Sequence, residues 1–236
     1  KDRVAVILGN SMGGESSDDH TVRTRIPEVI RSVKNGAVFS TLNEDVRTQL
    51  LSDIEQTKTH LPTINEDTMP GDLANVIAGR IANAFDFNGP NFTVDAACGS
   101  SMAAIQSAVD GLRNGTFDVA ISGGADRSMG VPTYVKFSKI GALSANLSAP
   151  FDERADGFVM GEGCAVLVLK RLSDAQRDGN RIYATIRSIG ASSDGKGKGI
   201  TAPNPKGQRL AIERAYEQAG INIDTVDYFE CHGTST

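Results

Sequence analysis

The 236-residue sequence has no hydrophobic run long enough to cross a membrane. A spanning helix needs about 20 consecutive apolar residues, whereas the longest apolar runs, at residues 3–9 and 164–169, are far shorter. The first residues are charged and lead straight into a short strand-like run, which is not the pattern of a signal peptide. We therefore expect a cytoplasmic protein with no membrane partner.

Paired cysteines and basic clusters are absent as well. Cys98, Cys164 and Cys231 are odd in number and form no CxxC pair, which argues against both a zinc site and a disulfide framework. The 24 Lys and Arg residues are outnumbered by 29 Asp and Glu residues, and no basic cluster offsets the net charge of −5. We therefore expect neither a metal site nor a nucleic-acid partner.

Glycine, in contrast, is abundant. It accounts for 25 of the 236 residues, which is above the usual content of about 7% in soluble proteins. Because glycine permits positive φ angles and close backbone approach, we expect loops to carry the chemistry. The hydrophobic content of 39% is enough for a substantial core, and no repeat or linker-like tract divides the chain.

Short β-branched runs alternate with helix-like segments, which predicts an α/β fold with parallel strand pairing. Gly115 is a plausible helix stop, and Asn204 is a plausible helix cap. The irregular stretches at residues 126–163 and 192–203 are long enough to be functional loops. Strands are expected at residues 4–8, 91–95, 117–122, 164–169, 182–189 and 226–231, and helices at residues 43–61, 71–85, 100–113 and 205–220.

Cys98 lies between a predicted strand and a helix that begins with small residues. A thiol in that position lies near the positive end of the helix dipole and beside unpaired backbone N–H groups, which stabilise a thiolate and offer an oxyanion site. The alternative is a small buried cysteine. Cys164 and Cys231 keep that second interpretation, and we expect both in the core.

Two other residues have sequence contexts that fit catalysis. His232 ends a predicted strand and precedes glycine and hydroxyl residues, which suits a site that binds a thioester carbonyl. Ser11 lies in a GxSxG pattern after a hydrophobic strand, so a serine hydrolase of α/β type using Ser11 and His232 is an alternative. That hydrolase turn requires a helix directly after it, and residues 14–19 do not resemble a helix start.

Three motifs in order resemble those of β-ketoacyl synthases over nearly the whole chain. Residues 95–98 and 193–203 are most similar to ketosynthase domains of large polyketide or polyunsaturated fatty acid synthases, whereas the last motif is similar to discrete bacterial fatty-acid enzymes. The motifs are VDAACGSS at residues 94–101, PFDERADGFVMGEG at residues 150–163 and HGTST at residues 232–236.

The resemblance implies a thiolase-like fold in α/β/α/β/α layers and a homodimer. It implies that Cys98 takes an acyl group from the phosphopantetheine arm of an acyl carrier protein. His232 would bind the carbonyl of a malonyl thioester, whose decarboxylation gives the carbanion that attacks acyl-Cys98 and forms a 3-oxoacyl product. No metal or redox cofactor is implied. By the same resemblance, Thr201, Thr234 and Thr236 would contact the arm, and Phe137 would gate the acyl pocket.

Members of that family begin with a further strand and helix and continue well past the HGTST motif. The continuation carries a second histidine, a lysine and a glycine-rich loop. We therefore expect residues 1–236 to be a partial domain, with an N-terminal region at 1–170 and the start of a C-terminal region at 171–236. We expect little or no condensation activity from this stretch alone, and a non-catalytic scaffold fragment of a synthase is a further alternative.

Overall fold

The computed structural model describes residues 1–127, 129–197, 199 and 202–236. These residues divide into two compact units. The first unit comprises Lys1–Leu169 and Thr234–Thr236, and the second comprises Lys170–Gly233.

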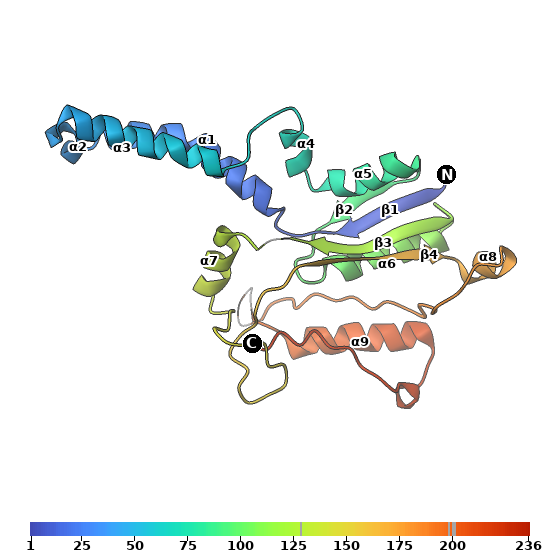
Figure 1. Ribbon diagram of the computed structural model, residues 1–236. Coiled ribbons are helices and arrows are strands. Elements are labelled where there is room, and N and C mark those ends of the chain that lie inside the picture. The colour runs from blue at the N-terminus through green and yellow to red at the C-terminus, as the bar shows by residue number, and fades with distance from the viewer. Residues whose placement is uncertain (128, 198, 200–201) are drawn as a thin grey trace. The chain divides into compact units, whose positions relative to one another are not determined.

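The first unit is built on a sheet with the strand order β2-β1-β3-β4 (Figure 1). Strand β1 pairs in parallel with both β2 and β3, and β4 runs in the opposite direction at the edge of the sheet (Figure 1). The strands are β1 (Val4–Gly9), β2 (Asn91–Val94), β3 (Val119–Asp126) and β4 (Gly163–Lys170), and the helices of this unit are α1 (Glu15–Lys34), α2 (Ala37–Thr41), α3 (Glu44–Gln56), η1 (Thr57–His60), α4 (Thr68–Asp72), α5 (Asn75–Phe85), α6 (Ser100–Arg113) and α7 (Val131–Lys139).

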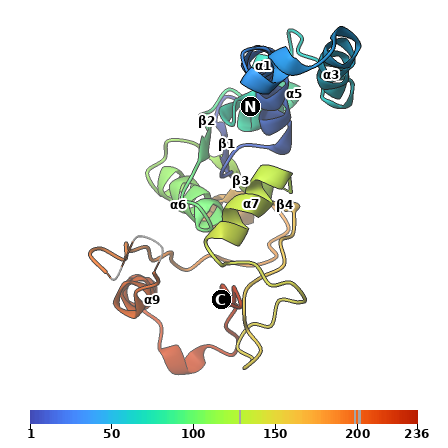
Figure 2. The same ribbon diagram turned by 90° about the vertical axis from the view of Figure 1, so that its left-hand side faces the viewer.

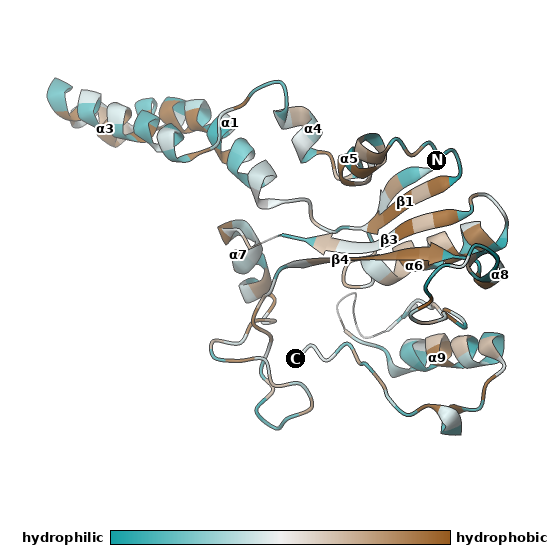
Figure 3. Ribbon diagram, turned by 45° about the vertical axis from the view of Figure 1, so that its right-hand side comes forward, coloured by the Kyte–Doolittle hydropathy of each residue, from teal (hydrophilic) through white to brown (hydrophobic). Residues whose placement is uncertain are grey.

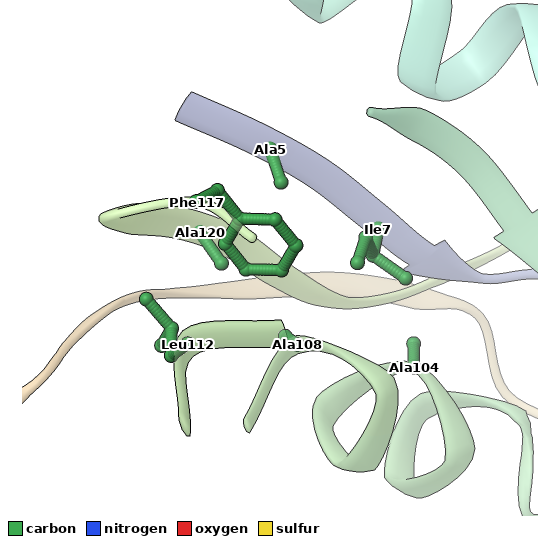
Figure 4. Close-up of a cluster of buried hydrophobic side chains, with 7 residues drawn as sticks. All are labelled: Ala5, Ile7, Ala104, Ala108, Leu112, Phe117 and Ala120. Atoms are coloured by element: carbon green, nitrogen blue, oxygen red, sulfur yellow. The ribbon is translucent and has the colours of Figure 1, made fainter. Parts of the chain in front are cut away.

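Successive residues of β1 point to opposite faces of the sheet, and each face is covered by one helix. Ala5 and Ile7 belong to a buried cluster with α6 and β3 (Figure 4). Val6 and Leu8 belong to a second cluster with α5. Because all four side chains are buried, β1 is a central strand covered on both faces, as expected of a parallel α/β sheet.

Helix α6 has the bounds that its hydrophobic spacing predicts. Ala104, Ala108 and Leu112 face the sheet, and Gly115 follows the helix with a positive φ of 71°. The small alanine side chains bring the helix close to β1 and β3. Helix α6 therefore holds its N-terminus beside the carboxyl ends of those strands, at the edge that faces the viewer in Figure 2.

Helices α1 and α3 contact each other and form a hairpin that extends from the sheet (Figure 1). The Arg23 guanidinium ties the hairpin together by donating to the carbonyl oxygens of Lys58 and Leu61, at 2.7 and 3.0 Å. Most residues of the hairpin are polar, whereas apolar residues gather in the strands (Figure 3). Helix α1 was not predicted, because its apolar residues are sparse and Pro27 interrupts them.

The second unit contains α8 (Leu172–Arg177), α9 (Pro205–Ala219) and η2 (Ile223–Thr225). The side chain of Asn204 caps α9, and the helix ends at Gly220 with a φ of 62°, as predicted. Residues 182–189 and 226–231 were predicted as strands, but the structure does not place them in strands. An extended segment becomes a strand only when its backbone pairs with a neighbour.

The mixed sheet with helices on both faces confirms the predicted α/β class. Within the part of the chain that the structure describes, no helix is both long and apolar enough to span a membrane.

Candidate functional site

The carboxyl ends of β1 and β3 and the N-terminus of α6 line a cavity of about 460 Å³ in the first unit. Cys98 lies in its wall, together with Ser11 from the loop after β1. Ile105 of α6 and Leu167 of β4 give the cavity an apolar side. This position agrees with the rule that ligand sites of parallel α/β sheets lie beyond the carboxyl ends of the strands.

A tight turn carries Cys98 from β2 into α6. Ala97, the residue before it, has a positive φ of 49°, which is uncommon for a residue with a side chain. Ser100 stabilises the turn, since its hydroxyl oxygen accepts from the N–H of Ala96 at 2.9 Å and donates to the carbonyl of Ala97 at 2.6 Å. The turn leaves Cys98 exposed at the cavity.

Two glycines let β1 and β3 approach the start of α6. A methyl group on Gly9 would lie 2.4 Å from the carbonyl carbon of Ser100 and from the amide nitrogen of Ser101. A methyl group on Gly124 would lie 2.9 Å from Cβ of Ser101. The start of α6 therefore lies against the strand ends. The N–H groups of Gly99 and Ser100 donate to the carbonyl oxygens of Ala96 and Ala97, at 3.0 and 3.1 Å, whereas the next N–H groups of the first turn have no carbonyl four residues earlier within the helix. Such donors can stabilise an oxyanion that forms next to the Cys98 thiol.

Asp95 connects this turn to the loop after β1. Its carboxylate accepts a 2.9 Å hydrogen bond from the backbone N–H of Ala97. That bond, followed by hydrogen bonds from the Ser11 side chain and the Met12 backbone, lowers the pKa of Asp95 despite a smaller opposing effect of burial. Asp95 was not predicted as a site residue, because the fold alone brings the two loops together.

We expect the Asp95→Asn variant to be less stable than the parent chain at neutral pH and equally stable in acid. The folded pKa of Asp95 is depressed, so its stabilisation is complete above the unfolded value of about 3.9 and is lost as the pH falls through the lower folded value. Melting temperatures of both chains between pH 7 and pH 3 measure this. A difference in melting temperature that stays constant from pH 7 to pH 3 would contradict the lowered pKa of Asp95.

The last three residues of the HGTST motif lie in the first unit against the loop that precedes β4. The Thr234 and Thr236 hydroxyl oxygens are 2.9 Å apart. Ser235 accepts hydrogen bonds from the N–H groups of Ala149 and Gly157. The motif is therefore held by residues that lie about 80 positions earlier in the sequence.

Phe137 lies on α7 and is half-buried. Its ring meets the edge of the Phe158 ring, with 5.5 Å between the centroids. The predicted irregular stretch 126–163 thus contains a helix as well as the loop that carries Phe158. This T-shaped pair is a common arrangement of aromatic rings.

Two further residues, His232 and Thr201, were predicted to belong to the site. His232 is an exposed residue of the second unit, and Thr201 is outside the described residues. Cys98, Phe137, Thr234 and Thr236 all belong to the first unit.

Cys164 and Cys231 are exposed, so the expectation of two core cysteines was wrong. Cys164 lies on β4, whose position at the edge of the sheet leaves it uncovered. Within the described residues, no three His, Cys, Asp or Glu side chains form a group that could hold a metal.

The loop after β1 differs from its predicted form. Helix α1 begins at Glu15, so a helix does follow the GxSxG pattern directly. The positive φ angles of this turn occur at Met12 and Gly13 and not at Ser11. The Ser11 side chain helps to lower the pKa of Asp95, which places it beside that carboxylate.

Comparison with known proteins agrees with this geometry. Residues 1–175 match the N-terminal domain of β-ketoacyl synthases, and residues 183–236 match the C-terminal domain. A polyunsaturated fatty acid synthase polypeptide of Thraustochytrium sp. is 38% identical over 237 residues, which cover 100% of this chain and 8% of the relative.

Two solved ketosynthases share the fold. The oxazolomycin ketosynthase domain from Streptomyces albus has a TM-score of 0.75 and 30% identity, over 99% of this chain and 35% of that one. The ketosynthase from module 6 of the Bacillus subtilis bacillaene synthase has a TM-score of 0.69 and 37% identity, over 74% of this chain and 32% of that one. The chain thus spans only a part of each relative, and it has the thiolase-like fold that the motifs implied. Motifs, fold and matched residues together show that the chain belongs to the β-ketoacyl synthase family.

Proposed function

We propose that the chain is part of a ketosynthase domain that extends acyl chains by decarboxylating Claisen condensation. The observation that carries this proposal is the position of Cys98, on a strained turn at the N-terminus of α6 and in the wall of a cavity with an apolar side. Family membership and this position favour Cys98 over Ser11 as the nucleophile.

In the first step, the Cys98 sulfur attacks the carbonyl carbon of an acyl thioester on the phosphopantetheine arm of an acyl carrier protein. The carbon–sulfur bond to the arm breaks, the arm leaves as a thiol, and the acyl group stays on Cys98. The N-terminal N–H groups of α6 stabilise the oxyanion of the tetrahedral intermediate. Thr234 and Thr236, with their adjacent hydroxyls, and also Thr201, bind the polar arm.

In the second step, a malonyl thioester loses carbon dioxide, and the electron pair of the broken carbon–carbon bond forms an enolate. His232 donates a hydrogen bond to the enolate oxygen. The enolate carbon attacks the acyl-Cys98 carbonyl, the Cys98 thiolate leaves, and a 3-oxoacyl thioester forms. Every electron pair comes from the substrates or from Cys98, so the proposed reaction uses no metal or redox cofactor.

The partners of this reaction are an acyl carrier protein and a second copy of the domain. Support for the carrier protein comes from the thioester chemistry assigned to Cys98. The homodimer rests on the family resemblance.

The loading step tests the proposal on the chain as it stands. The chain is incubated with an acyl-pantetheine thioester, and its intact mass is measured. We expect the mass of one acyl group to be added, and proteolytic mapping to place it on Cys98. Absence of an adduct, or an adduct on Ser11, would refute the proposed mechanism.

A Phe137→Ala substitution should shift loading toward longer acyl groups, because it removes the ring that packs against Phe158. The expected result is a several-fold rise in the loading rate of a long-chain thioester relative to a short-chain one. Phe85→Ala is the matched control. Phe85 is the last residue of α5, and its ring stacks on that of Phe87 at the same centroid distance of 5.5 Å. The same shift in both variants would argue against a gate at Phe137.

A further inference from the structure

Ser235 is held more closely than the threonines beside it. Its side chain is only 6% exposed, whereas Thr236 is exposed. Its φ angle is 66°, a left-handed conformation that costs free energy in a residue with a side chain. Such a conformation persists where surrounding contacts enforce it.

Two hydrogen bonds supply these contacts. The buried N–H of Ala149 donates to the Ser235 hydroxyl oxygen at 2.7 Å, and the N–H of Gly157 donates to the Ser235 carbonyl oxygen at 2.8 Å. Without the serine hydroxyl, the Ala149 N–H would be left buried with no acceptor from this residue, which is costly. Ser235 therefore joins two points of one loop to the HGTST motif.

The residues on either side of this connection belong to the candidate site. Gly157 is followed by Phe158, the partner of Phe137. The Gly157 backbone is fixed as well, because its φ is 147° and a methyl group there would lie 2.5 Å from the carbonyl carbon of Leu143. Ser235 itself lies between Thr234 and Thr236, whose hydroxyl oxygens are 2.9 Å apart.

We propose that Ser235 is a positioning residue, whose hydroxyl holds the two threonine hydroxyls in register with the loop that carries Phe158. The inference rests on the proposed function, in which the threonines bind the pantetheine arm and the aromatic pair borders the acyl group. A single thioester must contact the threonine hydroxyls with its arm and the aromatic pair with its acyl group at the same time. The alignment of these two parts of the site therefore determines how tightly the thioester binds. Ser235 acts through the threonines and does not touch the reacting atoms.

Two substitutions separate the hydroxyl from the backbone turn. Ser235→Gly removes the hydroxyl but adopts a φ of 66° without strain. Ser235→Ala removes the hydroxyl and keeps the strain. If Ser235 served only to form the turn, the Ser235→Gly variant would bind the thioester as tightly as the parent chain or more tightly. Ser148→Ala is the matched control, because the Ser148 hydroxyl accepts from the N–H of Val159 at 2.8 Å in the same loop.

The readout is single-turnover loading of Cys98 at increasing concentrations of an acyl-pantetheine thioester. For both Ser235 variants, we expect the half-saturating concentration to rise about tenfold, as for loss of a buried hydrogen bond. The limiting rate and the rate of Cys98 alkylation by iodoacetamide should stay close to those of the parent. The Ser148→Ala variant should match the parent in all three quantities.

A Ser235→Gly variant with the half-saturating concentration of the parent would overturn the inference. The inference would also be overturned if the limiting rate and the rate of iodoacetamide alkylation fell together in the Ser235 variants, because that result indicates general loss of structure. A parent chain that loads no acyl group would overturn the proposed function, and this inference with it. If the parent chain loads normally, a negative result for the Ser235 variants counts against the role of Ser235 and not against the proposed function.

Discussion

Replacement of Cys98 by alanine should reduce acyl loading from one group per chain to none. Alanine keeps the size of the side chain close to that of cysteine but has no nucleophile. The turn is held by Ser100 and Asp95, so we expect its geometry to persist in the variant. Intact mass after incubation with an acyl thioester measures the effect, and circular dichroism checks the fold.

Cys164→Ala and Cys231→Ala are the controls for this experiment. All three thiols are exposed, so exposure alone would load them alike. Only Cys98 precedes the N-terminus of a long helix, where backbone N–H groups stabilise the developing oxyanion. Both control variants should therefore load as the parent does. Loading that survives in Cys98→Ala would contradict the assignment of the nucleophile.

Replacement of Gly9 by alanine should destabilise the first unit by about 3 kcal/mol or more, at the upper end of the usual cost of overpacking. The new methyl group would lie 2.4 Å from backbone atoms of Ser100 and Ser101. Backbone atoms at the start of a packed helix cannot rotate away as a flexible side chain would, so α6 must shift from β1. Because Cys98 lies directly before α6, acyl loading should fall together with stability.

Gly71→Ala is the control for Gly9→Ala. Gly71 lies in helix α4, and a methyl group there would meet nothing within 4 Å. Alanine also favours the helix, so this variant should be as stable as the parent or slightly more stable. Chemical denaturation compares the three chains. Equal midpoints for Gly9→Ala and the parent would show that α6 can move without cost.

Local patterns predicted the parts of the fold that depend on local interactions. The bounds of α6, the cap of α9 at Asn204 and the ends at Gly115 and Gly220 follow from hydrophobic spacing and from the ability of glycine to adopt positive φ. Helix α1 escaped prediction, because α3 and not a local pattern provides its packing surface.

The candidate site was predictable to a smaller extent. Strand–helix context singled out Cys98, but nothing local marks Ala97 for a positive φ, because that angle is imposed by the turn into α6. The roles of Asp95 and Ser235 depend on partners brought together by folding, in the case of Ser235 from 86 positions away. The apolar neighbours of Cys164 in the sequence predicted that it is buried. Such neighbours indicate a hydrophobic strand but not whether that strand lies at the centre or at the edge of a sheet.

The uncovered position of β4 also affects how the chain behaves in solution. Val166, Leu167 and Val168 are 48%, 48% and 73% exposed, and the strand lies at the edge of the sheet. A long apolar edge strand offers free backbone groups to any other strand that meets it, so it is a site of aggregation. Separate copies of the chain should therefore associate first through β4.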